Sequence, residues 1–90
     1  MTAPDFGTAA LLSEPANYAV IQLPGRRFPG VVFQGDSLHA LRESVAALTA
    51  IQDADELKQE ATAIVRDLDK ILEGYVDVVR TRGRSLPFDA

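Results

Sequence analysis

The chain has 90 residues, a length that fits one domain. Its composition, 47% hydrophobic and 24% charged, is that of a globular protein and excludes an intrinsically disordered chain. It carries a net charge of −4 and no cysteine, which excludes disulfides, thiolate catalysis and zinc–sulfur sites. No apolar run approaches the roughly 20 residues that a membrane span needs. The first residues lack the pattern of a signal peptide, so we expect a cytoplasmic protein.

Three segments have the composition of strands. Residues 18–23 alternate side chains between two apolar faces, which indicates a central strand. The segment 31–34 is short and β-branched, and residues 8–13 are the weakest strand because alanine is a poor strand former. We expect residues 1–7 to be a flexible N-terminus, 8–82 to form a single α+β domain, and 83–90 to form a C-terminal tail.

Two Pro-Gly steps, Pro24-Gly25 and Pro29-Gly30, lie between the second and third predicted strands. Proline fixes φ and glycine accepts a positive φ, so each step predicts a turn and the loop between them should project. Arg26 and Arg27 lie on this loop. A pair of guanidinium groups can hold a carboxylate or a phosphate in bidentate fashion, although an exposed turn commonly carries arginines for solubility alone.

Two helices follow. The first is predicted over residues 38–51, capped by Asp36 or Ser37 and buried along a stripe. The second is predicted over residues 54–80, where Asp53 and Glu56 form a capping-box-like pair and Gly83 marks the end. The buried stripe of the first helix consists of Leu38, Leu41, Val45 and Leu48.

These elements predict an α+β fold, in which a three-stranded antiparallel β-meander precedes two helices, the second of them long. We expect the first helix to cover one face of the sheet. The second helix should pair antiparallel with the first and extend past it.

The second helix is the strongest candidate for self-association. Its apolar residues alternate in steps of four and three, as in a coiled-coil seam. About 27 residues make a helix near 40 Å long, longer than the first helix or a short sheet can cover. We therefore expect a homodimer, with an interface formed by Leu57, Ile64, Leu68, Ile71, Tyr75 and Val78.

No catalytic or metal constellation stands out. Asp36, Ser37 and His39 are close in sequence, but residues within one helical turn point outward at different angles and rarely form a triad. A helix cap followed by an exposed histidine explains them better. One histidine and scattered carboxylates offer no metal-ligand spacing, so we expect no cofactor and no enzyme activity.

Charge is distributed unevenly. Residues 53–77 contain eight acidic and three basic side chains, a local net charge of −5. The arginines outside that segment cluster at 26–27 and 80–84, with Arg42 on the first predicted helix. This distribution argues against a broad nucleic-acid-binding face and favours an acidic helix that meets a basic protein partner.

Residues 17–38 resemble a family of small uncharacterised bacterial proteins that share the core N-Y-A-V-x-x-L-P-G-R-x-F-P-G-V-x-x-Q-G-D-S-L. More distantly, Pro29-Gly30 and the run Gln34-Gly35-Asp36-Ser37-Leu38 are similar to HicB-type antitoxins. That resemblance implies a β-β-β-α domain that blocks a small ribonuclease toxin. Here the loop is basic and longer than in HicB proteins, and one long acidic helix follows in place of a helix-turn-helix or ribbon-helix-helix pattern, so the resemblance does not extend to a repressor.

Two classes of function remain open. The first is a non-catalytic protein-binding module, antitoxin- or immunity-like, with a toxin-like protein partner. The second is a binder of small ligands or nucleic acid that uses Arg26, Arg27 and Phe28. Binding to RNA or DNA that weakens with salt would favour the second class.

Overall fold

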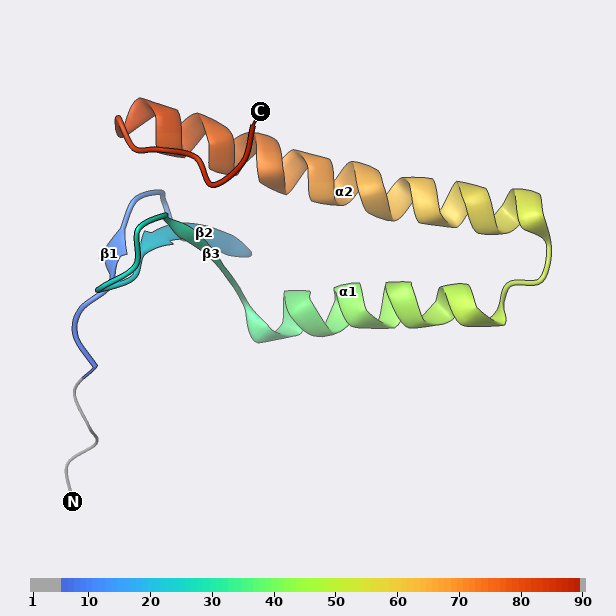
Figure 1. Cartoon of the computed structure of the whole chain (residues 1–90). Helices are drawn as coiled ribbons and strands as arrows, with labels where there is room; N and C mark the ends of the chain where they lie inside the picture. Colours follow the sequence, from blue (N-terminus) through green and yellow to red (C-terminus); the bar gives the residue numbers. More distant parts are fainter. Residues whose placement is uncertain (1–5, 90) are drawn as a thin grey trace, which may run out of the picture. The chain divides into compact units, whose positions relative to one another are not determined.

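The structure is a computed structural model that describes residues 6–89. Three strands form one antiparallel sheet in the order β1-β2-β3, and two helices follow them (Figure 1). The predicted α+β fold class is therefore confirmed. Most of the flexible N-terminus predicted for residues 1–7 falls outside the described residues. The elements are β1 (Ala10–Leu11), β2 (Tyr18–Gln22), β3 (Gly30–Phe33), α1 (Gly35–Ala47), the 3-10 turn η1 (Leu48–Ala50) and α2 (Ala54–Thr81).

The chain divides into two compact units. One, here called the sheet unit, consists of the residues up to Val32 and those from Tyr75 onward. The other, here called the hairpin unit, is Phe33–Gly74 and contains α1, η1 and most of α2. In the hairpin unit, α1 and α2 run in opposite directions (Figure 1), as we expected from the sequence.

The first strand is shorter than predicted. Instead of covering residues 8–13, β1 is limited to Ala10 and Leu11, which pair with Gln22 and Ile21 of β2. Beyond β1, the amide of Leu12 still donates to the carbonyl of Val20 at 2.8 Å. The amide of Val20, however, donates to Ser13 Oγ at 2.9 Å. The serine side chain thus takes the place of the next backbone acceptor, and the strand ends there.

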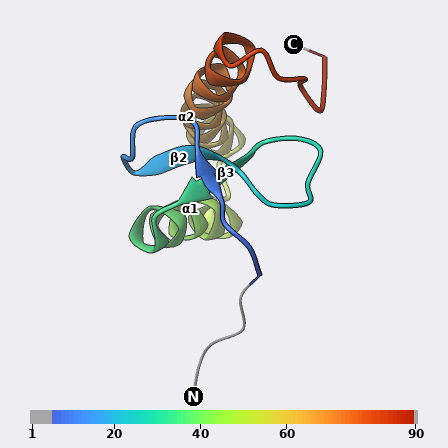
Figure 2. The ribbon, with the colours of Figure 1, turned by 90° about the vertical axis from the view of Figure 1, so that its left-hand side faces the viewer.

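The loop between β2 and β3 contains only one of the two predicted turns. At Pro24-Gly25, glycine adopts φ +73° and the amide of Arg26 donates to the carbonyl of Leu23 at 3.4 Å, which is a type II arrangement. The prediction of a turn at Pro29-Gly30 was wrong, because Gly30 has no positive φ and begins β3. Figure 2 shows this loop projecting from the sheet.

The start of α1 was also predicted wrongly. The helix begins at Gly35, so Asp36 and Ser37 lie inside its first turn and not at the cap. The N-cap is Gln34, which is extended and makes no side-chain capping bond. Asp36 Oδ1 instead accepts from the amide of Ser37 at 2.9 Å. An acidic residue in the first turn still favours the helix through the dipole.

Both ends of α2 agree closely with the prediction. Asp53 Oδ1 accepts a hydrogen bond from the amide of Asp55 at 3.2 Å, as expected of an N-cap. At the other end, Gly83 has φ +67° and its amide donates to the carbonyl of Arg80. The amide of Arg84 donates to the carbonyl of Val79, which completes a Schellman motif.

The core of the sheet unit joins the strands to the last turns of α2. Its buried members are Leu12 and Val20 from the sheet segment and Tyr75 and Val79 from α2. Val20 and Val79 are 0% exposed. The hydroxyl of Tyr75 donates to the carbonyl of Pro29 at 2.6 Å, so the one polar group of this core is paired. Val31, Val76, Val78 and Leu86 pack around this cluster.

Within the sheet unit, the apolar cover of the sheet comes from the last turns of α2. None of the α1 side chains is buried, and none belongs to the core cluster. The predicted stripe of the first helix is therefore not a buried stripe, since Leu38 and Val45 are exposed and Leu41 and Leu48 only half-buried. Tyr75 and Val79 at the end of α2 provide this cover within the sheet unit. Within residues 6–89, no helix is long and apolar enough to cross a membrane.

Truncation of Val79 to alanine should lower the free energy of unfolding by about 2–3 kcal/mol, because it removes two buried methyl groups and leaves a cavity. Val32→Ala is the matched control, since Val32 is exposed in β3, and it should cost less than about 1 kcal/mol. Urea denaturation followed by circular dichroism measures both. Equal losses in the two variants would contradict this core.

Alkaline pH should destabilise the protein through Tyr75. Burial raises the pKa of the Tyr75 phenol above its usual value of 10.0. The unfolded chain therefore loses this proton first, and the free energy of unfolding falls as pH rises from about 10 through the folded-state pKa. Below pH 10 this contribution is constant.

Tyr75→Phe tests this, because it removes the titrating group and also leaves the Pro29 carbonyl without its donor. We expect a loss of about 1–2 kcal/mol at pH 7. The variant should also lose part of the decline in the free energy of unfolding that the parent shows above pH 10. Parallel pH curves for the two proteins would refute the assignment.

Candidate functional site

The arginine loop, residues 23–30, is fixed by hydrogen bonds from three side chains of the sheet unit, two of them directly and the third through Gln22. The side-chain amide of Gln22 donates to the carbonyl oxygens of Leu23 at 3.3 Å and Arg26 at 2.7 Å. Arg84 Nη1 donates to Gln22 Oε1 at 3.2 Å, so the C-terminal segment fixes the glutamine in turn. With Tyr75 bound to Pro29 at the other end, the backbone of the loop is anchored at both ends.

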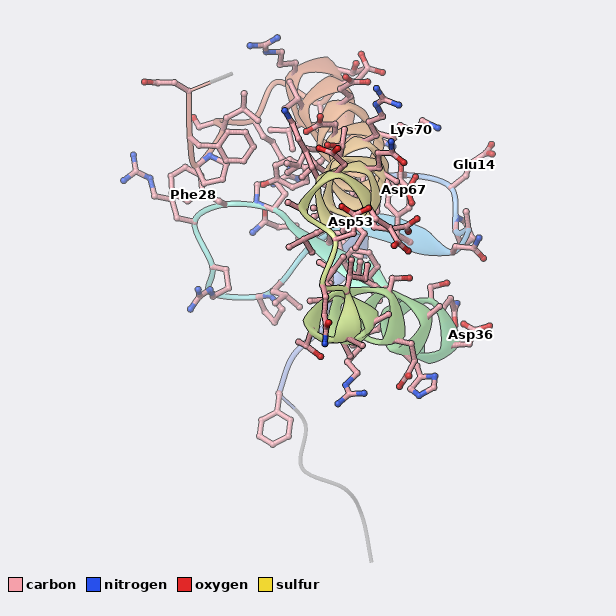
Figure 3. The ribbon with its side chains drawn as sticks, turned by 90° about the vertical axis from the view of Figure 1, so that its right-hand side faces the viewer. Glu14, Phe28, Asp36, Asp53, Asp67 and Lys70 are labelled. Atoms are coloured by element: carbon pink, nitrogen blue, oxygen red, sulfur yellow. The ribbon has the colours of Figure 1, made fainter. Side chains whose placement is uncertain are left out.

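The two arginines of this loop are exposed, and among the described residues neither forms an ion pair. The guanidinium carbon of Arg27 lies 5.0 Å from the centroid of the Phe28 ring, a cation–π distance. Phe28, labelled in Figure 3, is half-buried, so its ring gives the Arg27 side chain a contact on the loop itself. The arginine charges are therefore presented on a fixed backbone with no carboxylate beside them.

A shallow hollow of about 540 Å³ accompanies the loop. No acidic side chain lines it, and its polar groups are backbone atoms and the two guanidinium groups. This lining can attract an anionic group by charge and by guanidinium hydrogen bonds. The lining residues are Leu23, Gly25, Arg26, Arg27, Phe28, Pro29, Gly30 and Pro87.

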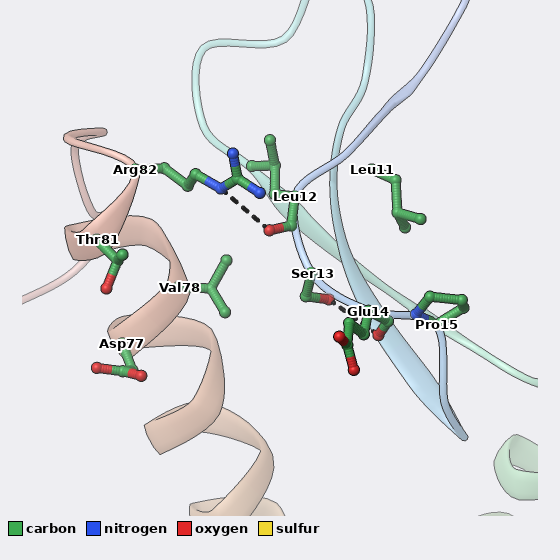
Figure 4. Close-up of a pocket in the computed structure, with 9 residues that line it drawn as sticks. All are labelled: Leu11, Leu12, Ser13, Glu14, Pro15, Asp77, Val78, Thr81 and Arg82. Carbon is green, nitrogen blue, oxygen red and sulfur yellow. Dashed lines mark hydrogen bonds between the residues drawn. The ribbon is translucent and has the colours of Figure 1, made fainter.

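A larger hollow of about 680 Å³ lies between the segment after β1 and the end of α2 (Figure 4). Its polar groups already serve the fold. Arg82 Nε donates to the carbonyl of Leu12 at 3.2 Å, and Ser13 Oγ accepts from Val20 and donates to the carbonyl of Glu14. The remaining charged groups, Glu14 and Asp77, are acidic, whereas Arg82 is basic. The lining of this hollow therefore has no single sign of charge that would select a ligand.

The triad-like residues of α1, all of them described, make separate contacts and do not bond to one another as a triad would. His39 Nε2 lies 3.4 Å from Glu43 Oε1, one turn along the helix, and both side chains are exposed. Among the described residues, no hydrogen bond joins Ser37 to His39. Within that same part of the chain, no three potential metal-ligating side chains come together.

The hairpin unit leaves its apolar side chains uncovered. Every residue of this unit is described, and none of them is buried. Leu38 and Val65 are 54% and 53% exposed, values unusual for apolar residues at heptad-like spacing on long helices. The exposed large apolar residues of this unit are Leu38, Val45, Leu57, Val65, Leu68 and Leu72.

The six predicted interface residues divide into two groups. Leu57 and Leu68 are exposed, and Ile64 and Ile71 are half-buried, so these four can still contact another chain. Tyr75 is buried in the core of its own chain, and Val78 packs against that core. The apolar stripe thus runs along the whole of α2, but only the stripe residues in its last turns are packed against other residues of the core.

Charge is segregated between the two units. By sequence, the sheet unit carries five arginines and four acidic residues, a net charge of +1. The hairpin unit carries nine acidic and four basic residues, a net charge of −5. Asp53 lies at the start of α2, and Asp67 and Lys70 lie further along it (Figure 3). The hairpin unit therefore exposes apolar side chains on a surface of net negative charge.

Sequence reasoning missed three residues that shape the site. Gln22 and Arg84 brace the arginine loop, and the hydroxyl of Tyr75 holds its second end. β2 is largely apolar and ends in Gln22. A polar amide in such a strand was a signal for a specific role. Arg84 and Phe88 fell in the predicted tail. Arg84 binds Gln22, and Phe88 stacks on Tyr75 at 6.1 Å between ring centroids.

Comparison with known proteins places the chain in a family. No curated protein and no solved structure matches it. One family model, described as a family of unknown function (DUF6959), matches residues 7–88. That match includes nearly all of the sheet unit and the whole of the hairpin unit. The chain therefore belongs to the DUF6959 family.

Proposed function

We propose that this chain is a non-catalytic protein-binding module that dimerises through α2. The observation that carries the proposal is the hairpin unit, in which not one of the residues from Phe33 to Gly74 is buried. Folding of so short a segment depends on hiding apolar surface, and a helix pair without a buried side chain gains little from packing. A partner chain supplies the missing cover.

A second copy fits the dimensions of the uncovered surface. The 28 residues of α2 make a helix of about 42 Å, and a standard interface buries about 800 Å² on each partner. The four available stripe residues, Leu57, Ile64, Leu68 and Ile71, repeat at steps of seven, four and three, the spacing of a coiled-coil seam. The same surface on both copies makes the contact self-complementary.

The similarity to HicB-type antitoxins supports an antitoxin- or immunity-like role for the dimer. In that role the acidic hairpin unit, with its net charge of −5, occupies a small basic protein. The expected companion is a short reading frame encoding a basic, toxin-like protein beside this gene. Co-purification of the two proteins is the direct test.

The arginine loop favours a second candidate function, the binding of an anionic small ligand or nucleic acid. The supporting observation is that Arg26 and Arg27 carry unpaired charge on a backbone anchored by Gln22, Arg84 and Tyr75. A preorganised loop loses less conformational entropy when it binds. The absence of acidic residues from its hollow suits an anion.

Light scattering at tens of micromolar tests the dimer. We expect the parent chain to have twice the monomer mass and Ile71→Glu to have the monomer mass, because each copy would otherwise bury a carboxylate against its partner. Gln59→Glu is the matched control: it adds the same charge on the opposite side of α2, at an exposed position, and should remain a dimer.

Circular dichroism completes this test by checking that α2 persists in both variants. Ile71 is preferred to Val78, because Val78 packs against the core and its replacement would damage the fold as well. A monomeric parent chain would refute dimerisation. An Ile71→Glu variant that keeps the dimer mass would move the interface away from α2.

Replacement of Arg26 and Arg27 by alanine tests the loop. If the loop binds anions, the double variant should lose salt-dependent binding to inorganic phosphate or RNA at least tenfold, while its free energy of unfolding changes by less than about 0.5 kcal/mol. Arg66→Ala, at an exposed position of α2, is the control for a lost surface charge. Identical binding by the parent and the double variant would assign the loop to solvation alone.

A further inference from the structure

We infer that the arginine loop and the C-terminal segment, residues 84–88, together form one site for a compact phosphate group, in which the segment positions the loop. This inference rests on the anion-binding role proposed for the loop, and it names both the ligand and the second element of the site. Two separate links between the segment and the loop lead to it, together with the charge of the hollow that they share.

The first link runs from Arg84 through Gln22 to the start of the loop. Arg84 Nη1 donates to Gln22 Oε1 at 3.2 Å, and Gln22 Nε2 donates to the carbonyl oxygen of Arg26 at 2.7 Å. The backbone hydrogen bond of the turn itself, from the amide of Arg26 to the carbonyl of Leu23, is long at 3.4 Å. The turn that presents the arginines therefore depends on the Gln22 side chain, and Arg84 fixes the orientation of that side chain.

The second link runs from Phe88 through Tyr75 to the end of the loop. The Phe88 ring stacks on the Tyr75 ring, with 6.1 Å between the ring centroids and 27° between the ring planes. The Tyr75 hydroxyl donates to the carbonyl oxygen of Pro29 at 2.6 Å. Leu86 packs against the core that contains Tyr75. Side chains thus join the C-terminal segment to both ends of the loop.

The C-terminal segment also lines the hollow beside the loop. Pro87 belongs to the lining of this hollow of about 540 Å³, and the other lining residues belong to the loop. Figure 2 shows the chain after α2 running to the same side of the sheet as the loop. Two of the lining side chains, Arg26 and Arg27, are charged, and both are basic. The two elements therefore enclose a surface that carries a charge of +2.

Charge favours a compact phosphate group over a nucleic-acid strand. A phosphate monoester carries nearly two negative charges at neutral pH and offers three acceptor oxygens, which suits two guanidinium groups. A nucleic-acid strand gains affinity from many phosphate contacts, and two arginines on a chain of net charge −4 provide few of them. The guanidinium carbon of Arg27 lies 5.0 Å from the centroid of the Phe28 ring, so the ring face that it covers is not available to stack on a base.

The role of the C-terminal segment can be measured because binding and docking are linked. A loop that is already fixed loses less conformational entropy when it binds a ligand. Loss of both links should therefore weaken phosphate binding, although neither Arg84 nor Phe88 lines the hollow. By reciprocity, bound phosphate should hold the segment more firmly in place. Arg84, Gln22 and Phe88 are thus positioning residues, and the loop arginines make the ionic contacts.

Arg84→Ala combined with Phe88→Ala removes both links and leaves the lining of the hollow unchanged. The matched control is Arg66→Ala combined with Phe6→Ala, which removes the same two types of side chain at exposed positions. NMR titration with inorganic phosphate at constant ionic strength measures the dissociation constant of the parent chain and both double variants. We expect this constant to rise at least about threefold in the first double variant and to stay close to the parent value in the control. Circular dichroism checks that both variants fold.

Equal dissociation constants in the two double variants overturn the inference. The anion-binding role of the loop still stands in that case if replacement of Arg26 and Arg27 by alanine abolishes phosphate binding. Binding of single-stranded RNA that is tighter than phosphate binding and strengthens with the length of the RNA overturns the compact ligand. A parent chain that binds neither phosphate nor RNA refutes the proposed anion-binding function itself.

Limited trypsin digestion of the parent chain tests the linkage without a change in the C-terminal segment. Saturating inorganic phosphate should slow cleavage after Arg84 at least about threefold, because bound phosphate stabilises the docked segment. Cleavage after Arg66, in the hairpin unit, should keep its rate and is the internal control. The variant without Arg26 and Arg27 should lose this protection. An unchanged rate of cleavage after Arg84 would contradict the linkage, even if the double variant of the segment failed to fold.

Discussion

The packing of Tyr75 and Val79 against Leu12 and Val20 is the contact on which the sheet unit depends. It joins the end of the longest helix to strands more than 50 residues earlier in the chain. Three-stranded sheets of two to five residues per strand cannot hide an apolar face alone, and these last turns of α2 provide that cover. The Tyr75 hydroxyl extends the same contact to Pro29, so the core and the arginine loop are stabilised together.

That contact uses only the last turns of α2, and the remaining apolar stripe has consequences for function. The hairpin unit keeps a net charge of −5 and a row of uncovered leucine and valine side chains. Single exposed apolar residues are common on protein surfaces and cost little free energy. A continuous row of them along a helix favours association with another molecule. The protein thus combines one unit with its own core and one unit, fully described, in which no residue is buried.

Element types were predictable because they depend on local chemistry. The second strand, the Pro24-Gly25 turn, the Asp53 cap and the end of α2 at Gly83 followed from short patterns. Two boundary predictions failed for different reasons. Ser13 Oγ replaced a backbone acceptor and ended β1 early. At the start of α1, Gln34 took the cap position that Asp36 and Ser37 were expected to fill, although its side chain makes no capping hydrogen bond.

By itself, the sequence determined the fold class, the long second helix with its apolar stripe, and the exposed arginines of the loop, because periodicity, turn residues and charge are local properties. Only the tertiary structure showed that the last turns of α2 pack on the strands, and how the stripe is divided. Tyr75 and Val79 are the heptad equivalents of Leu68 and Leu72, yet only the first two meet Leu12 and Val20. The braces of the arginine loop, Gln22 with Arg84 and Tyr75 with Pro29, join residues 62 and 46 positions apart. No periodic pattern encodes such pairs, because chain folding alone brings them together.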